Sequence, residues 1–406
     1  MAKQYSPFAL NLNYKPEEQT SSQFERVGYV EIDFGKDAGG GERVRQFHGL
    51  DFRFKVVKIL NNYPQGFAEV SILGLDQDTI NRLTELTTQE QAVLKQKRVR
   101  VYAGYKKKGD DNYKGDLICD MDIIYATPTT TPPEVWVTIT AGVRYMDKKY
   151  RIDISLPDNL SLVDITYGQG GFVHSRKYSF KNLCEDVVRV INREYDKISK
   201  DENQGNPTFT KLELDWRLEE DDFTTDNTLV AKPLRAGADG LPYIPPFQES
   251  KKTVSEILER LNNYFAGGRK LWVYVDSGRN PNTDYLVVCP VAIKKKKEKA
   301  DADRAKAIKR NEFFHKFGTV HYVDTAHGMI GLPSLIKGNE LRCKMLLSPT
   351  IKASEWVKVD SKIIPKLNGY WIVNKIEHTG HFRGNEWYTS VVAYDGDKAK
   401  PGSSLK

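Results

Sequence analysis

The chain has 406 residues, which predicts two to four domains, each large enough for a hydrophobic core of its own. Its 39% hydrophobic and 11% aromatic residues exclude a generally disordered protein, and no apolar run approaches the length of a membrane span. Much of the net charge of +7 lies in a lysine run with acidic residues close behind it, a pattern typical of a solvated linker rather than of a nucleic-acid binding face.

The first 153 residues are rich in strand signals. Tyr29–Phe34 alternates between apolar and polar residues and leads into the glycine-rich turn Gly39–Gly41. Two β-branched and aromatic runs flank the turn Asn61–Gly66, which is a hairpin signature. We expect strands at Phe52–Ile59, Phe67–Leu73, Val99–Tyr105, Asp116–Tyr125 and Val135–Thr140, a hairpin loop at Thr129–Pro133, and a short helix that buries Ile80, Leu83 and Leu86. Such a series of short strands predicts a closed β-barrel or a sandwich, which hides the edges of the sheet.

The middle of the chain, from about residue 155 to 290, contains helical patterns. Apolar residues spaced three and four apart predict an amphipathic helix capped by Ser179, with Phe180, Leu183, Val187, Ile191, Tyr195 and Ile198 on one face. A capping box at Thr253–Glu256 begins a second helix, which ends at Gly267–Gly268. This helix should bury Ile257, Leu261 and Phe265, and strands should follow at Leu271–Val275 and Tyr285–Val288. One or two small α+β modules are therefore expected.

The β-pattern returns after a charged linker at residues 293–317. We expect strands at Gly318–Asp324, Glu340–Leu347, Glu355–Val359, Tyr370–His378 and Trp387–Tyr394. The polar tail from residue 396 to 406 is expected to be flexible.

Two stretches of the chain read as variations on one β-unit. The first contains Gly115-Asp-Leu-Ile118 and, further on, Trp136-Val-Thr138-Ile-Thr-Ala141. The second contains Gly369-Tyr-Trp-Ile372 and then Trp387-Tyr-Thr389-Ser-Val-Val-Ala393. In each, a glycine opens one strand and a Trp-x-Thr motif opens the next. A duplicated β-unit without a catalytic constellation indicates a scaffold or a ring-forming protein.

The four cysteines, Cys119, Cys184, Cys289 and Cys343, lie far apart and form no CxxC motif. This spacing predicts reduced thiols that act as small core residues, in a chain folded in a reducing compartment. The N-terminus has no apolar signal segment, so we expect a protein made in, and remaining in, a cytoplasm-like environment.

Histidines in the last unit are the strongest candidates for metal ligands. His378 and His381 share one predicted turn, His321 and His327 precede them, and Asp324 could add a carboxylate that zinc accepts. Their spacing matches no metal-ligand signature, and the Thr-Gly-His-Phe-Arg-Gly turn has a purpose of its own in reversing the chain. We therefore expect no metal and no cofactor.

Enzymatic chemistry finds little support in the sequence. No nucleophile elbow, Walker loop or dinucleotide fingerprint is present, and Gly168–Gly171 lacks the Lys-Ser/Thr that a phosphate loop needs. The acidic run Glu219–Asp222 could supply the paired carboxylates of a glycoside hydrolase, although adjacent acids in a loop are usually solvated. A peptidoglycan hydrolase using Glu219 or Asp222 is the alternative function, and nucleic-acid binding through Lys294–Lys297 is a third. No catalytic residue is expected.

The C-terminal motifs resemble the second tube domain of central baseplate hub proteins, which belong to phage tails and are related to the base of type VI secretion spikes. The resemblance lies in Gly328-Met-Ile-Gly-Leu-Pro333, Leu346-Leu-Ser-Pro349, Gly369-Tyr-Trp-Ile-Val and His378-Thr-Gly-His-Phe-Arg-Gly-Asn-Glu-Trp387-Tyr-Thr389. The first unit is similar to the family's first tube domain in the Phe67 to Leu75 strand, Ala103-Gly-Tyr105 and the Gly115-Asp strand. Family members often have Asp after the His-x-Gly turn, where this chain has His381.

This resemblance implies a mainly β protein with two similar antiparallel β-barrel tube domains that flank a smaller α+β middle region. The expected segments are a first barrel at residues 1–153, α+β modules at 154–292, a linker at 293–317, a second barrel at 318–395 and a tail at 396–406. Hub proteins form trimers whose six barrels make a pseudo-six-fold ring, which matches a hexameric tail tube on one side and a trimeric spike on the other. Any spike or lysozyme-like domain should be a separate protein, because the chain ends soon after the second unit.

The resemblance also implies the partners and the location. We expect a homotrimer that binds a tail tube or distal tail protein, a central spike and the tape measure protein. DNA should pass through the lumen without specific binding, and no membrane should be involved. The protein should be assembled in the host cytoplasm and remain in the virion, in the tail baseplate.

Overall fold

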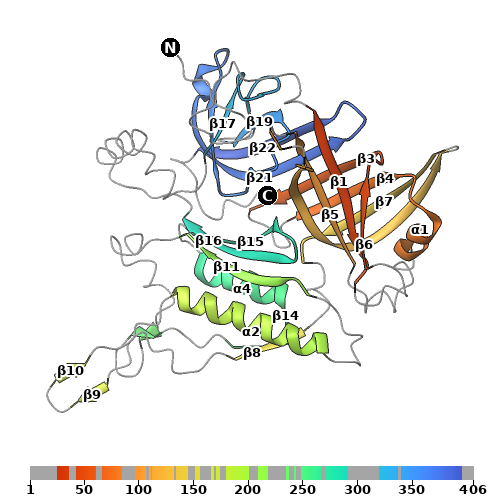
Figure 1. Cartoon of the computed structure of the whole chain (residues 1–406). Coiled ribbons are helices and arrows are strands. Elements are labelled where there is room, and N and C mark those ends of the chain that lie inside the picture. Colours follow the sequence, from red (N-terminus) through yellow and green to blue (C-terminus); the bar gives the residue numbers. More distant parts are fainter. Residues whose placement is uncertain are drawn as a thin grey trace.

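The structure is a computed structural model of the chain (Figure 1). It describes residues 25–35, 43–60, 66–84, 97–106, 109–110, 112–131, 134–144, 151–155, 166–168, 171–173, 180–200, 209–217, 235–236, 242–243, 248–266, 271–290, 320–336 and 340–395. Within these residues the expected fold class is confirmed, because β-strands dominate and one α+β module lies between two β-units. In the same residues no helix is long and apolar enough to cross a membrane.

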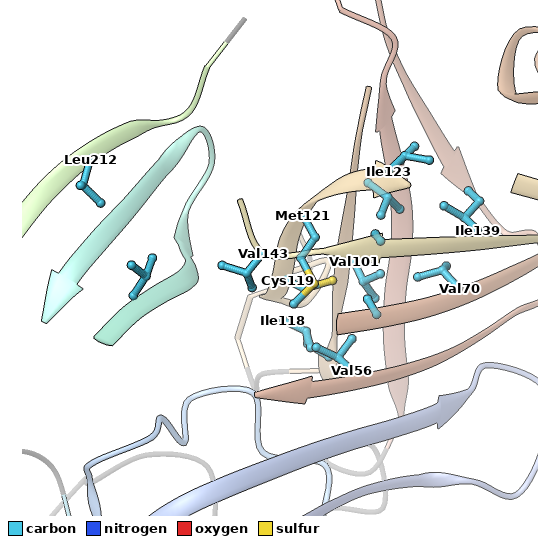
Figure 2. Close-up of a cluster of buried hydrophobic side chains, with 14 of the residues drawn as sticks. Val56, Val70, Val101, Ile118, Cys119, Met121, Ile123, Ile139, Val143 and Leu212 are labelled. Atoms are coloured by element: carbon cyan, nitrogen blue, oxygen red, sulfur yellow. The ribbon is translucent and has the colours of Figure 1, made fainter. Parts of the chain in front are cut away.

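The first unit consists of strands that run antiparallel to their neighbours. Their order is β3-β4-β7-β6-β5-β1-β2. The strands are β1 (Arg26–Asp33), β2 (Val44–His48), β3 (Phe52–Ile59), β4 (Gly66–Leu73), β5 (Arg98–Tyr105), β6 (Asp116–Thr131) and β7 (Glu134–Gly142), with helix α1 (Gln77–Thr84) between β4 and β5. Alternate side chains of these strands face one core, and Figure 2 shows Val56, Val70, Val101 and Ile139 meeting there.

The second unit repeats this arrangement in the same chain order. Its strands lie in the order β18-β19-β22-β21-β20-β17, which corresponds to β3-β4-β7-β6-β5-β1 of the first unit. They are β17 (Val320–Asp324), β18 (Ser334–Leu335), β19 (Glu340–Leu346), β20 (Trp356–Asp360), β21 (Gly369–His381) and β22 (Trp387–Asp395), with the 3-10 helix η8 (Pro365–Leu367) before β21. One difference is that β17 runs parallel to β20, whereas β1 runs antiparallel to β5.

The two units share a single 13-stranded sheet, which the sequence did not suggest. The first part of β21 pairs with β20 over Gly369–Ile372, and its second part leaves β20 and pairs with β3 over Lys375–His381. Strand β21 therefore joins the two units by pairing residues that lie more than 300 positions apart in the chain.

The middle module is a three-stranded sheet, in the order β11-β16-β15, with helices α2 and α4 on one face (Figure 1). Its elements are β8 (Arg151–Ser155), β9 (Thr166–Gly168), β10 (Gly171–Val173), α2 (Phe180–Lys200), β11 (Lys211–Trp216), β12 (Arg235–Ala236), β13 (Pro242–Tyr243), β14 (Gln248–Thr253), α4 (Val254–Ala266), β15 (Leu271–Asn280) and β16 (Thr283–Pro290). The apolar stripe of α2 is buried at Leu183, Val187, Ile191 and Tyr195, as the spacing predicts.

The predicted capping box of α4 is confirmed. The Thr253 backbone N–H donates to Glu256 Oε2 at 2.8 Å, and the Glu256 backbone N–H donates to Thr253 Oγ1 at 3.2 Å. Two otherwise unpaired donors of the first helical turn are thus satisfied.

Replacing Thr253 by alanine is expected to lower the free energy of unfolding by about 1 kcal/mol, because it removes the side-chain acceptor of the cap. Urea denaturation followed by circular dichroism measures this change. Thr253→Ser keeps the hydroxyl and should remain within about 0.5 kcal/mol of the original protein. Equal losses in the two variants would contradict the capping role.

Most predicted strands coincide with observed ones, and two details are wrong. Thr129–Thr131 is not a loop: these residues continue β6 and pair with Glu134–Trp136 of β7. The two Trp-x-Thr motifs are also not equivalent, because Trp387 is buried in the core whereas Trp136 lies half-buried on the opposite face of its strand. A register difference of one residue exchanges the two faces of a strand.

Several expectations fall on residues that the structure does not describe. These are the turns Gly39–Gly41 and 61–65, the cap Ser179, the helix stop at Gly267–Gly268, Leu86, the linker 293–317 and the tail 396–406. All four cysteines are described, and each is a free thiol buried in the structure, as expected.

Candidate functional site

The histidines do not form one site. His321 Nε2 lies 2.8 Å from Glu355 Oε2, and His327 Nδ1 lies 2.6 Å from Asp324 Oδ1. His378 and His381 point to opposite faces of β21, since they are three residues apart on one strand. Among the described residues, no group of three or more histidine, cysteine or carboxylate side chains is placed to hold a metal ion.

His378 is instead a core residue. Its ring is 1% exposed, and Nδ1 lies 2.9 Å from Thr389 Oγ1. Burial, with a smaller contribution from the positive charge of Lys58, lowers the pKa of His378 to about 3, so the imidazole is neutral at physiological pH.

The other candidate groups lie outside the residues that the structure describes. This applies to the acidic run Glu219–Asp222, with the proposed hydrolase residues Glu219 and Asp222, and to the basic run Lys294–Lys297. Within the described residues the candidate histidines are not brought together, and the features that stand out are contacts between the units.

The seam between β21 and β3 is closely packed. Phe54 and Trp387 meet edge to face with ring centroids 5.6 Å apart, and Phe52 stacks on Phe382 at 5.2 Å. Gly380 lies directly opposite Phe54, and a Cβ atom at this glycine would lie 2.2 Å from Phe54 Cε1. Only a residue without a side chain fits here, so the seam holds the two units in one fixed register.

The turn after β21 is also tied to the first unit. His381 Nε2 lies 3.1 Å from Asp51 Oδ2, and the Arg383 backbone N–H donates to Asp51 Oδ1 at 3.1 Å. Arg26 donates to the Gly384 carbonyl. His381, which departs from the Asp that the resemblance leads one to expect, pairs in this chain with a carboxylate of the other unit.

A buried charge network joins the first unit to the middle module. Arg98, whose side chain is 5% exposed, donates to Asp120 Oδ1 at 2.8 Å and to Asp122 Oδ1 at 2.6 Å, and also bonds to the hydroxyl of Thr210. Burial raises the pKa of Asp120, but the charges of Arg98 and Arg100 outweigh it, so the net pKa is lowered and the carboxylate stays ionised.

A second ion pair of this network lies deeper. Arg144 Nη1 lies 3.2 Å from Asp284 Oδ2, and both side chains are 1% exposed. Burial raises the pKa of Asp284 to about 7 although Arg144 opposes it. Among the residues that the structure describes, Asp284 Oδ1 has no hydrogen-bond partner, which leaves this carboxylate poorly compensated.

The sequence contains a signal for this network that was missed. Charged residues alternate on neighbouring strands, with Glu31 and Asp33 on β1, Arg98 and Arg100 on β5, and Asp120 and Asp122 on β6. Because residues two apart share a face, each strand presents one sign of charge to the next.

The opposite face of the shared sheet, which we call the open face, carries hydroxyl groups and charges of both signs. Lys55 and Glu377 form an ion pair across the seam at 3.5 Å, and Ser71 and Thr138 are hydrogen-bonded at 2.9 Å. The exposed or half-buried side chains of this face include Arg53, Lys55, Glu69, Ser71, Tyr125, Thr127, Thr138, Thr140, Arg342, Lys344, Lys375, Glu377, Thr379 and Ser390.

Comparison with known proteins finds a family model that matches about a third of the chain. Residues 33–170 match the model of the family described as baseplate hub gp41. No curated protein matches the chain. The resemblance to phage baseplate hub proteins that the sequence predicts is therefore confirmed over this part of the chain.

Solved structures with a similar course of the chain come from tail and secretion proteins. A 43 kDa tail protein of prophage MuSo2 from Shewanella oneidensis aligns with a TM-score of 0.43 at 9% identity, over 91% of this chain and 98% of that one. A tail protein from Neisseria meningitidis MC58 gives 0.42 at 10% identity, over 91% and 97%. The E. coli c3393 protein, a type VI secretion component, gives 0.42 at 6% identity, over 85% and 73%.

Proposed function

We propose that this chain is the structural baseplate hub of a phage tail. Three copies form a pseudo-six-fold ring that joins the hexameric tail tube to the trimeric central spike. The observation that carries the proposal is the repeated unit, since two β-units of the same strand order, fused in one sheet, supply two quasi-equivalent positions per chain. The match of residues 33–170 to a baseplate hub family supports it independently.

Symmetry gives the duplication its purpose. A ring of identical chains contacts a six-fold tube on one side and a three-fold spike on the other only if each chain presents two similar surfaces to the tube. The differences between the units, such as the parallel β17–β20 pair and the inserted middle module, keep the assembly three-fold elsewhere. The five segments expected from the sequence, with boundaries at 153, 292, 317 and 395, are part of this proposal.

The open face suits the lumen of such a ring. Its charges are of both signs and partly paired, as in Lys55 with Glu377, and hydroxyl groups separate them. Affinity for DNA depends on cations that neutralise phosphates, so a mixed lining of this kind lets DNA and the tape measure protein pass without holding them.

We infer a structural rather than an enzymatic role. The hydrolase alternative depends on Glu219 and Asp222, and no described feature favours it. A turbidity assay on peptidoglycan tests it directly: clearing by the protein that is lost in Glu219→Gln would establish the alternative. The proposed location is the tail baseplate of the virion, after synthesis in the host cytoplasm, with no membrane stage.

Light scattering over a range of protein concentrations is the primary test of the ring. The expected species has three times the chain mass of 46.3 kDa, alone or after addition of the spike protein, and it co-purifies with the tube or distal tail protein. A monomer that stays monomeric with spike and tube proteins present would overturn the proposal.

A further inference from the structure

One strand end in the second unit is paired within the chain, whereas the equivalent strand end in the first unit has no described partner. In the second unit, the outer half of β21 pairs with β3. In the first unit, β6 corresponds to β21: β5 pairs with it up to Asp122, as β20 pairs with the start of β21. Beyond that point, over Tyr125–Thr131, no described strand pairs with β6 on the side away from β7.

The other end of the sheet has the complementary open edge. The segment Gly328–Ile336, which contains β18, runs along β19 through a Met329–Met345 bridge and the pairs Ser334–Arg342 and Leu335–Leu341. It takes the position beside β19 that β3 takes beside β4. The outer side of β3 is covered by β21, whereas no described strand covers the outer side of β18.

The two edges share a composition that invites pairing. Charged residues make up 28% of the chain, yet neither Tyr125–Thr131 nor Gly328–Ile336 contains one. Charges are one of the devices that keep an exposed edge from pairing with another chain, and neither edge has them. Four of the six exposed large hydrophobic side chains in the described part of the chain also lie here: Tyr125, Ile330, Leu332 and Leu335.

We propose that Tyr125–Thr131 of one copy adds as an antiparallel strand to the Gly328–Ile336 edge of a second copy. The inference rests on the proposed ring and names its subunit interface. The partner is a second copy of this chain, because the β21–β3 seam already shows the same kind of contact within the chain. The two open edges lie at separated positions of one sheet, so they can meet only between two copies. Such a head-to-tail contact closes into a ring when the rotation per copy divides a full turn.

The template also fixes the register. When the two units are compared position by position, the bulges of β6–β7 and β21–β22 make Tyr125 equivalent to Lys375. Following the pairings outward through β4 and β19 makes Val56 of β3 equivalent to Leu335 of β18. The seam pairs Thr379 with Lys55, so Thr129 of one copy should lie opposite Ser334 of the next. Pro128 then faces Leu335. Proline donates no N–H, so this position contributes one hydrogen bond fewer than its neighbours to the contact.

Disulfide trapping tests the register. Directly opposed residues of antiparallel strands have Cα atoms about 4.5–5.5 Å apart, a span that a disulfide bridges. The Thr129→Cys, Ser334→Cys double variant should form covalent dimers and closed trimers under mild oxidation, dissolved by reductant. Thr130→Cys with Ser334→Cys is the matched control, because a shift of one residue turns the two thiols to opposite faces and should reduce the yield at least tenfold.

A charge at the edge gives a second readout. Leu335→Lys should weaken self-association at least tenfold in light scattering, whereas Ile363→Lys, at a side chain 73% exposed in another loop, should leave it unchanged. An oligomer that forms normally in Leu335→Lys and gives no register-specific cross-link would overturn this interface and leave the proposed ring standing. A chain that stays monomeric with its partners and forms no cross-link would overturn both.

Discussion

Replacing Arg98 by methionine is expected to lower the free energy of unfolding by about 3–5 kcal/mol. The guanidinium lies within 2.8 Å of Asp120 and 2.6 Å of Asp122, and those carboxylates are 1% and 2% exposed in their side chains. Methionine fills a similar volume but leaves two buried negative charges without their main partner. The loss should appear in the first urea transition, together with faster proteolysis of the middle module, because Arg98 also bonds to Thr210.

Arg43 provides the matched control for this prediction. It pairs with Asp33 at 3.1 Å, a comparable distance, but its side chain is 45% exposed. Arg43→Met should therefore cost less than about 1 kcal/mol. Adding Asp120→Asn and Asp122→Asn to Arg98→Met should recover part of the loss, since the uncompensated charges are then removed. A cost for Arg98→Met no larger than that for Arg43→Met would show that the network does not anchor the module.

Local patterns predicted the elements of this fold well. In strand Gly66–Leu73, for example, every second side chain from Ala68 to Ile72 is buried, as the alternation of its residues predicts. The capping box at Thr253 and Glu256 acts within four residues, so its geometry could be read from the chain alone.

The arrangement of the units could not be predicted in the same way. The β21–β3 seam joins residues more than 300 positions apart, and no periodicity within either strand specifies a partner at that distance. The Trp-x-Thr echo shows the limit of motif matching: the duplication is visible in the strand order, yet Trp136 and Trp387 face opposite ways. Which positions of the two units are equivalent depends on the strand order and on the β-bulges, and a short motif encodes neither.

Acidification is expected to destabilise the protein through His378. The imidazole has a pKa of about 3 in the folded chain against an ordinary value of 6.5, because burial disfavours its charged form. Between these values the unfolded chain binds a proton that the folded chain does not, so stability falls as the pH drops below about 6.5. At 1.36 kcal/mol per pKa unit, the loss reaches about 2 kcal/mol at pH 5 and about 4 kcal/mol near pH 3.

A variant without the titrating ring separates the contribution of His378 to the pH dependence from that of the carboxylates and of the other histidines. His378→Gln can still hydrogen-bond to Thr389, and its urea stability should fall by about 2 kcal/mol less than that of the original protein between pH 7.5 and pH 5. His48→Gln, at an exposed histidine of β2, should change the pH dependence far less than His378→Gln does. His378 also lies opposite Val56 in the seam, so the protonated ring would place a charge beside Lys58 where the two units meet. If His378→Gln kept the full pH dependence, the acid sensitivity would have to come from another buried group, with Asp284 excluded because its raised pKa of about 7 stabilises the fold as the pH falls.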